Sequence, residues 1–126
     1  MTEFSSLDGL KVLVVEDETI VAMLLEQMLE ELGCTVVGVA GQVGVATELA
    51  RTTEADVAIL DMNLGGSKVD PVAEVLAKRN VPFVFASGYG EDGVPPEWRG
   101  RPVLPKPFRL EQLRDAVEAA TARAKA

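Results

Sequence analysis

The sequence of 126 residues contains no histidine and a single cysteine, Cys34. The absence of histidine excludes histidine-ligated zinc, Ser-His-Asp and Cys-His catalysis, and a role as a phosphohistidine carrier. One cysteine permits neither an internal disulfide nor a cysteine cluster that could hold a metal ion. Such cysteine usage suits a reducing compartment, and we expect a cytoplasmic protein.

Long hydrophobic runs are also missing. No segment reaches the roughly 18–20 apolar residues that a membrane-spanning helix needs. The first ten residues, MTEFSSLDGL, lack the basic start and the long apolar stretch of a signal peptide. We therefore expect no membrane partner. The length predicts one domain over residues 1–126, with no output domain after the last predicted helix.

Positive charge is scarce, with 12 basic against 20 acidic residues and a net charge of −8. Such a domain repels a phosphate backbone, so we expect no nucleic-acid partner. The charge is uneven along the chain. Residues 1–96 hold 5 basic and 16 acidic residues, whereas residues 97–126 hold 7 basic and 4 acidic ones. The basic end either belongs to an ordinary solvated surface or marks a partner surface.

What the sequence does contain is an alternation of short apolar runs and helical patterns. The runs predict strands at residues 10–15, 35–40, 55–60, 81–86 and 102–104. Helical spacing predicts helices over residues 18–32, around 45–50, from an Asp70 cap with Pro71 in the first turn, and from Leu110 onward. Residues 62–68 predict a loop. Glycines and prolines in residues 88–101 allow at most a short or broken fourth helix.

Alternating strands and helices predict an α/β fold with right-handed crossovers and a doubly wound parallel sheet. Five strands in this length suit the flavodoxin-like order 2-1-3-4-5. Ligand sites on such sheets lie at the carboxyl ends of the strands. The polar residues at those ends are therefore the candidates for function.

Charged and hydroxyl side chains stand at four of these strand ends: Glu16 and Asp17, Asp61, Ser87, and Lys106. The order 2-1-3-4-5 makes the first and third strands neighbours, so the three acids converge. They repel one another unless a cation joins them, and hard oxygen ligands suit Mg²⁺. A lysine and a hydroxyl opposite them suit an anion. A cation site beside an anion site, with a carboxylate between, is typical of phosphoryl transfer.

These motifs resemble those of response-regulator receiver domains over residues 10–122. The matching segments are VLVVEDE, ILDMNLGG, FASGYG and LPKPF. The resemblance implies that Asp61 accepts a phosphoryl group from a histidine kinase or a histidine phosphotransfer protein. It implies that Mg²⁺ is bound by Asp17, by Asp61, by the backbone carbonyl of Asn63 and, through water, by Glu16. It further implies that Ser87 and Lys106 contact the phosphoryl group and that the Lys106–Pro107 bond is cis.

The segment Pro82–Tyr89 is similar to the PFxFATGY signature of the "FAT GUY" receivers, which are usually single-domain proteins of alphaproteobacterial stress phosphorelays. Here Ser87 replaces the signature threonine, which keeps the hydroxyl and loses a methyl group. Val103 stands where ordinary receivers carry an aromatic switch residue, and its short, stiff side chain cannot make the same swing. We therefore predict that Tyr89, flanked by glycines, responds when Ser87 binds the phosphoryl group. Its alternative role is a lid that limits water access.

Other interpretations remain open beside phospho-dependent protein binding. The domain could be a phosphate shuttle or sink within a relay, or a pseudo-receiver adaptor that is not phosphorylated. The run Gly88–Gly93 spells a dinucleotide-binding GxGxxG, but Pro95 and Pro96 prevent the helix that such a site needs. The Asp61–Asn63 pair resembles a haloacid-dehalogenase start, but the acid expected at the second position is Asn63.

Overall fold

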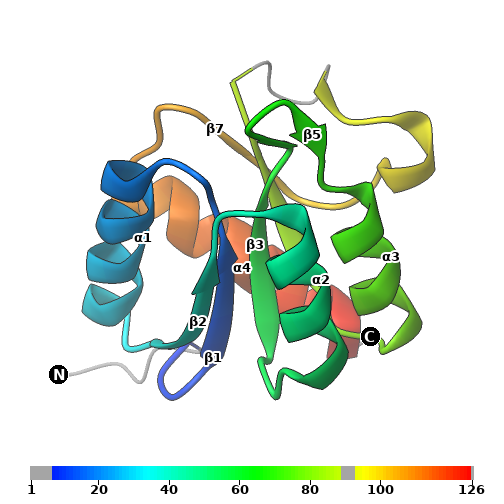
Figure 1. Cartoon of the computed structure of the whole chain (residues 1–126). Helices are drawn as coiled ribbons and strands as arrows, with labels where there is room; N and C mark the ends of the chain where they lie inside the picture. The colour runs from blue at the N-terminus through cyan, green and yellow to red at the C-terminus, as the bar shows by residue number, and fades with distance from the viewer. Residues whose placement is uncertain (1–6, 89–92, 126) are drawn as a thin grey trace, which may run out of the picture.

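A computed structural model, which describes residues 7–88 and 93–125, shows a five-stranded sheet in the order β2-β1-β3-β6-β7 (Figure 1). Each neighbouring pair is parallel. The strands are β1 (Lys11–Val15), β2 (Thr35–Ala40), β3 (Val57–Asp61), β6 (Phe83–Ser87) and β7 (Val103–Pro105). Counted along the chain as sheet strands, this is the predicted order 2-1-3-4-5, and the predicted fold class is confirmed.

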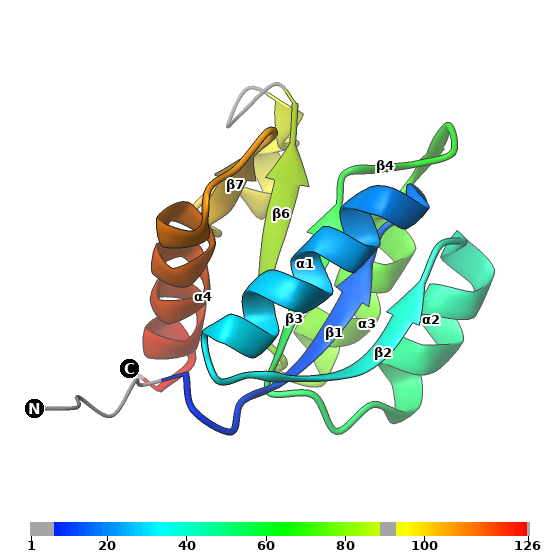
Figure 2. The same ribbon diagram turned by 90° about the vertical axis from the view of Figure 1, so that its left-hand side faces the viewer.

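In the part of the chain that the structure describes, four α-helices cover the two faces of the sheet, two on each face. They are α1 (Thr19–Glu31), α2 (Val43–Thr52), α3 (Asp70–Lys78) and α4 (Leu110–Lys125). Helices α1 and α4 lie on the face turned to the viewer in Figure 2, and α2 and α3 lie on the other face. One buried apolar cluster fills each interface, so the sheet is sandwiched between two hydrophobic layers.

The central strands follow from their composition. All five residues of β3 and of β6 are buried, as are four of the five in β1. Strands buried on both faces favour continuous apolar runs over alternation. Helix α1 stops at Gly33, where φ is +90° and a Cβ atom would overlap the side chain of Asp8. Only glycine adopts this backbone conformation without strain, so the turn into β2 depends on it.

The stretch predicted as a loop at residues 62–68 contains a short antiparallel pair, β4 (Asn63–Leu64) and β5 (Ser67–Lys68). The pattern looked like a loop because two glycines occupy its centre. Gly65 and Gly66 both have positive φ, which is what a two-residue hairpin turn requires. The glycines therefore close a hairpin directly after β3.

The start of α3 differs from the prediction in one detail. Asp70 was expected to cap the helix, but the capping position is Val69 and no side-chain cap hydrogen bond is formed. Asp70 is the first helical residue instead. Its carboxylate accepts a hydrogen bond from the indole N–H of Trp98, 3.2 Å away, and so is oriented toward another part of the fold.

The connection between β6 and β7 has no α-helix among its described residues, 88 and 93–102. The described part contains the 3-10 turn Pro96–Trp98. Val94 is buried in the apolar cluster on the α2 and α3 side, and Trp98 packs against the same cluster. The predicted erosion of the fourth helix is therefore observed in this part of the connection.

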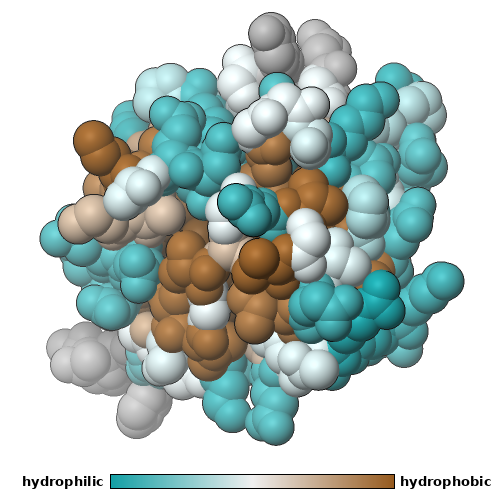
Figure 3. All heavy atoms as spheres, in the orientation of Figure 1, coloured by the Kyte–Doolittle hydropathy of each residue, from teal (hydrophilic) through white to brown (hydrophobic). Residues whose placement is uncertain are grey.

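Apolar side chains remain exposed over the edge strand β2 and toward α2, where brown atoms gather in Figure 3. They include Val37, Val39 and Val45, each more than two-fifths exposed. The β1–β2 register is shifted by an irregularity between Val12 and Leu13, which leaves Val37 outside the pairing. Among the described helices, none combines the length and apolar character needed to span a bilayer.

Candidate functional site

The polar residues predicted from strand ends do meet at one edge of the sheet. Asp61 and Ser87 are the last residues of β3 and β6, while Glu16 and Lys106 directly follow β1 and β7. Backbone hydrogen bonds continue past two of these ends: the Glu16 N–H donates to Ala40 at 2.9 Å, and the Lys106 N–H donates to Ser87 at 3.0 Å. The sheet hydrogen bonding itself therefore positions these side chains.

The ammonium of Lys106 lies inside a group of carboxylates. Its Nζ atom is 3.2 Å from Glu16 Oε1, 3.4 Å from Asp61 Oδ2 and 4.0 Å from Glu18 Oε1. Glu16 and Asp61 are 3% and 7% exposed, so these two ion pairs are shielded from water. A buried pair of like charges is tolerated when a cation lies between them, and Lys106 provides that cation here.

Backbone N–H groups fix the other oxygen of each buried carboxylate. Glu16 Oε2 accepts from the Glu18 N–H at 3.1 Å, and Asp61 Oδ1 accepts from the Asn63 N–H at 3.2 Å. The Asn63 side chain in turn accepts from the Gly66 N–H at 3.0 Å, across the hairpin turn. Both carboxylates are thus held in one orientation, with one oxygen each directed at Lys106.

Burial raises the pKa of the Glu16 carboxyl to about 7, against the lowering effect of the hydrogen bond from Glu18. Asp61 adds to the rise and Lys106 opposes it. Burial also lowers the pKa of Lys106, but the charges of Asp61 and Glu16 outweigh it, so this pKa lies above its usual value. The cluster therefore places a Lys106 ammonium that stays protonated beside a Glu16 carboxyl whose protonation changes near neutral pH.

The three acids also form a group that could hold a metal ion. One carboxylate oxygen from each of Glu16, Asp17 and Asp61 lies within 4.8 Å of the others. Asp17 is exposed, and the contact of the buried Glu16 Oε1 is its 3.2 Å ion pair with Lys106. Hard oxygen donors with one open side suit a small divalent cation that keeps some of its water. This acidic cluster is typical of the magnesium site of receiver domains.

An open hollow of about 380 Å³ lies above these groups. Asp61 lines this hollow next to Ser87 and Lys106, so one side of its carboxylate can be reached from solvent. The residues that line it are Asp17, Glu18, Asp61, Met62, Asn63, Gly65, Gly66, Ser87, Gly88 and Lys106. Of the predicted site residues that the structure describes, all except Glu16, Val103 and Pro107 are in this set. Glu16 lies beneath it, in contact with Lys106.

The remaining predicted residues fall in different places. Val103 is half-buried in β7 and packs against the apolar cluster on the α2 and α3 side. The bond between Lys106 and Pro107 is cis. Tyr89 lies outside the described residues. Sequence reasoning missed Glu18 as part of the site, although its place in the acidic run after β1 was a signal.

Comparison with known proteins places these features in a family. The family model described as "Response regulator receiver domain" matches residues 12–118. SdrG from Sphingomonas melonis Fr1 is 46% identical, with a TM-score of 0.80 over 89% of this chain and 96% of that one. The structure described as the BeF3-activated conformation of SdrG from Pseudomonas melonis Fr1 is 44% identical, with a TM-score of 0.76 over 90% and 98%.

A curated relative is longer than this chain. The transcriptional regulatory protein PdtaR of Mycobacterium tuberculosis (strain H37Rv) is 32% identical over 117 residues, which are 90% of this chain and 57% of the relative. The chain thus spans a little over half of that protein.

Proposed function

Because the chain belongs to the family of response-regulator receiver domains, we propose that it accepts a phosphoryl group on Asp61 in a magnesium-dependent reaction. A receiver domain is a phosphoacceptor signalling domain rather than an enzyme. The donor we propose is the phosphohistidine of a histidine kinase or a histidine phosphotransfer protein, since the chain itself contains no histidine. We propose phospho-dependent protein binding as the output.

The observation that carries this proposal is the setting of the Asp61 carboxylate. Asn63 holds one of its oxygens and Lys106 faces the other, at the floor of an open hollow. In the proposed step a carboxylate oxygen of Asp61 attacks phosphorus, the P–N bond breaks, and its electron pair stays on the imidazole of the donor. Position and neutralised charge are the main contributions that a protein makes to such a transfer.

The residues that would hold Mg²⁺ are Asp17, Asp61, the backbone carbonyl of Asn63 and, through water, Glu16. The ion, when bound, supplies positive charge to the phosphoryl oxygens. Ser87 and Lys106 would contact the transferred group, with Lys106 exchanging its ion pair with Asp61 for one with the phosphoryl oxygens. Lys106 Nζ is 3.4 Å from Asp61 Oδ2, so it would need to move only a short distance to reach a phosphoryl group on Asp61.

The test is labelling with acetyl phosphate or a phosphorylated kinase, read on a phosphate-affinity gel. We expect Asp61→Asn to abolish the shifted band and EDTA to abolish it in the unchanged protein. Asp115→Asn, which removes an exposed carboxylate on α4 that is not among the residues lining the hollow, serves as the matched control and should label normally. Full labelling of Asp61→Asn, or labelling that survives EDTA, would overturn the assignment.

A second experiment separates the proposed outputs. Mixing the phosphorylated domain with an unphosphorylated histidine phosphotransfer protein tests for a shuttle or sink, which would return the phosphoryl group within minutes. A protein-binding domain would keep it and would bind a partner with phosphate-dependent affinity. A domain that accepts no phosphoryl group from any donor would instead be a pseudo-receiver. The likeness to SdrG, whose activated conformation has been solved, supports the phosphorylated form.

A further inference from the structure

Trp98 connects two parts of the molecule that are far apart in sequence. Its indole N–H donates to Asp70 Oδ2 at 3.2 Å, at the start of α3. Its ring packs edge-on against Phe83, with centroids 5.7 Å apart, and at a tilt against Phe85, 6.2 Å away. Both phenylalanines lie in β6 and are fully buried. The 3-10 turn that carries Trp98 is therefore held by one charge-assisted hydrogen bond and by aromatic packing.

Each of these contacts leads to a residue of the candidate site. Asp70 follows the β4–β5 hairpin, which begins two residues after Asp61 and lines the hollow. Phe85 precedes Ser87 by two residues in the same strand. Trp98 thus touches the helix that follows the β4–β5 hairpin and the strand that ends in the proposed hydroxyl contact. Movement at either place alters the geometry around Trp98.

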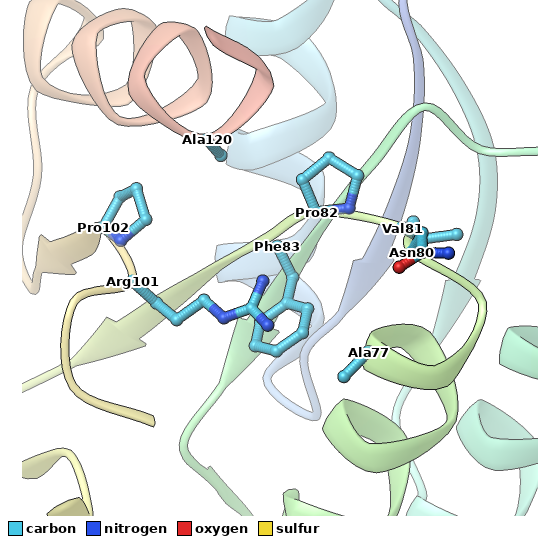
Figure 4. Close-up of a pocket in the computed structure, with 8 residues that line it drawn as sticks. All are labelled: Ala77, Asn80, Val81, Pro82, Phe83, Arg101, Pro102 and Ala120. Carbon is cyan, nitrogen blue, oxygen red and sulfur yellow. The ribbon is translucent and has the colours of Figure 1, made fainter. Parts of the chain in front are cut away.

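Arg101 adds a second contact to the same strand. Its guanidinium carbon lies 4.2 Å from the centroid of Phe83, and its backbone N–H donates to the backbone carbonyl of Trp98 at 3.3 Å. Figure 4 shows Arg101 extended over this ring at the mouth of a pocket of about 240 Å³. Trp98 and Arg101 therefore both contact Phe83 and tie the connection to β6.

We propose that Trp98 and Asp70 are positioning residues for phosphorylation, whose contact holds β6 and α3 in the arrangement of the unphosphorylated domain. The inference rests on the proposed function. A phosphoryl group shifts an equilibrium only through contacts that differ between two states. Its contacts with Ser87, at the end of β6, and with the hairpin that leads into α3 arise only after transfer. They therefore act next to the two elements that Trp98 joins. The Trp98–Asp70 hydrogen bond is the contact given up in exchange.

The test is the affinity of the protein for beryllofluoride, a phosphoryl mimic, in the presence of Mg²⁺. Trp98→Phe keeps a ring and removes the N–H donor, and Asp70→Ala removes the acceptor. We expect each to bind beryllofluoride about three- to tenfold more tightly, because the unphosphorylated form loses a contact. The double variant should gain little more than either single one, because both remove the same interaction.

A control variant tests whether the change in beryllofluoride affinity is specific to the Trp98–Asp70 contact. Asp56→Asn changes an exposed aspartate that accepts a backbone hydrogen bond from Lys11 at the opposite edge of the sheet, and it should leave the affinity unchanged. Thermal melts of all variants measure stability separately. A lower melting temperature with unchanged affinity would show that the contact serves only the fold, and weaker binding by Trp98→Phe would place it in the phosphorylated state. Either result overturns the inference.

The fluorescence of Trp98 gives an independent measurement in the unchanged protein, since it is the single tryptophan of the sequence. We expect its emission to shift when beryllofluoride binds and to stay constant in Asp61→Asn. Binding without any emission change would contradict the inference while leaving the proposed function intact. Absence of beryllofluoride binding in the unchanged protein would overturn the proposed function and, with it, this inference.

Discussion

The carboxyl edge of the sheet and the connection between β6 and β7 are built in opposite ways. At the edge, regular strands and their hydrogen bonds place Glu16, Asp61 and Lys106 within ion-pair distance. In the connection, no α-helix is present among described residues 88 and 93–102, and side chains supply the order. Val94 and Trp98 cover the sheet there, and Arg101 lies over Phe83.

The comparison shows that strand pairing can position the charged residues of the site even where the described part of one connection contains no α-helix. Strand register alone decides which residues meet at the edge, because all side chains at strand ends follow the pairing. The connection is therefore free to vary, and its few aromatic and polar contacts can depend on the state of the site. Four predictions test how separable the two regions are.

The largest effect is expected from Phe83→Ala, which removes the ring shared by Phe85, Trp98 and Arg101. Truncating a fully buried phenylalanine lowers the free energy of unfolding by about 3–5 kcal/mol. Urea unfolding measures this loss. If the regions are separable, the folded variant still labels on Asp61 at low temperature. Loss of labelling in the folded variant would show that the connection is part of the site.

Lys106→Ala should have the next largest effect, on the metal-free protein. Removing the cation leaves Glu16 and Asp61 buried side by side, at a cost of about 3 kcal/mol. Added Mg²⁺ should then raise the melting temperature more than in the unchanged protein, since it replaces the missing charge. We also expect the variant to accept phosphate with a weaker structural response. An equal magnesium-induced shift in both proteins would contradict this role of Lys106.

A smaller effect concerns pH. The pKa of Glu16 is raised from 4.5 to about 7, so the folded state favours its protonated form. This contribution to stability is complete below pH 4.5 and is lost as pH rises to 7. Without Mg²⁺, the melting temperature relative to Glu16→Gln should therefore fall over this interval. Parallel melting curves for the two proteins would show that Glu16 is not titrating there.

The smallest effect is expected at Cys34, at the end of the sheet opposite the charged site. Burial raises the pKa of this thiol to about 11, and Asp8 adds to the rise, so the reactive thiolate is scarce at neutral pH. Alkylation by iodoacetamide should be slow and should not change when beryllofluoride binds. A change in rate would reveal that the response reaches the far end of β2, and so would break the separation of the two regions.

The local pattern predicted the strands and their polar ends, and the flavodoxin-like order that suits five alternating strands then predicted that these ends converge. An apolar run followed by a polar residue, repeated along the chain, fixes the strand and its end together. The limits of the strands differ from the prediction by up to two residues, since apolar residues such as Val81 continue beyond the sheet. The roles of Asp17, Asp61, Ser87 and Lys106 stay predictions until phosphorylation is measured.

The pattern of apolar runs and polar ends could not predict features that depend on tertiary contacts. The role of Asp70 was misjudged because a helix-start aspartate usually caps its own helix, and nothing local indicates that Trp98 takes its carboxylate instead. The hairpin was missed because a turn of two glycines resembles a loop in sequence. Glu18 was missed although it stands in the acidic run after β1, because its 4.0 Å contact with Lys106 from beyond β7 is a tertiary contact.

The edge strand β2 has a consequence for how the protein behaves in bulk solution. Its sequence, TVVGVA, contains neither a charged residue nor a proline, which are the residues that usually prevent another strand from pairing with an exposed edge. Val37 and Val39 are also exposed to solvent. The register irregularity and the net charge of −8 are what oppose edge-to-edge association. Salt shortens the reach of that repulsion from about 10 Å at 0.1 M to about 3 Å at 1 M. Concentrated solutions should therefore stay clear in dilute buffer and become turbid as salt is added.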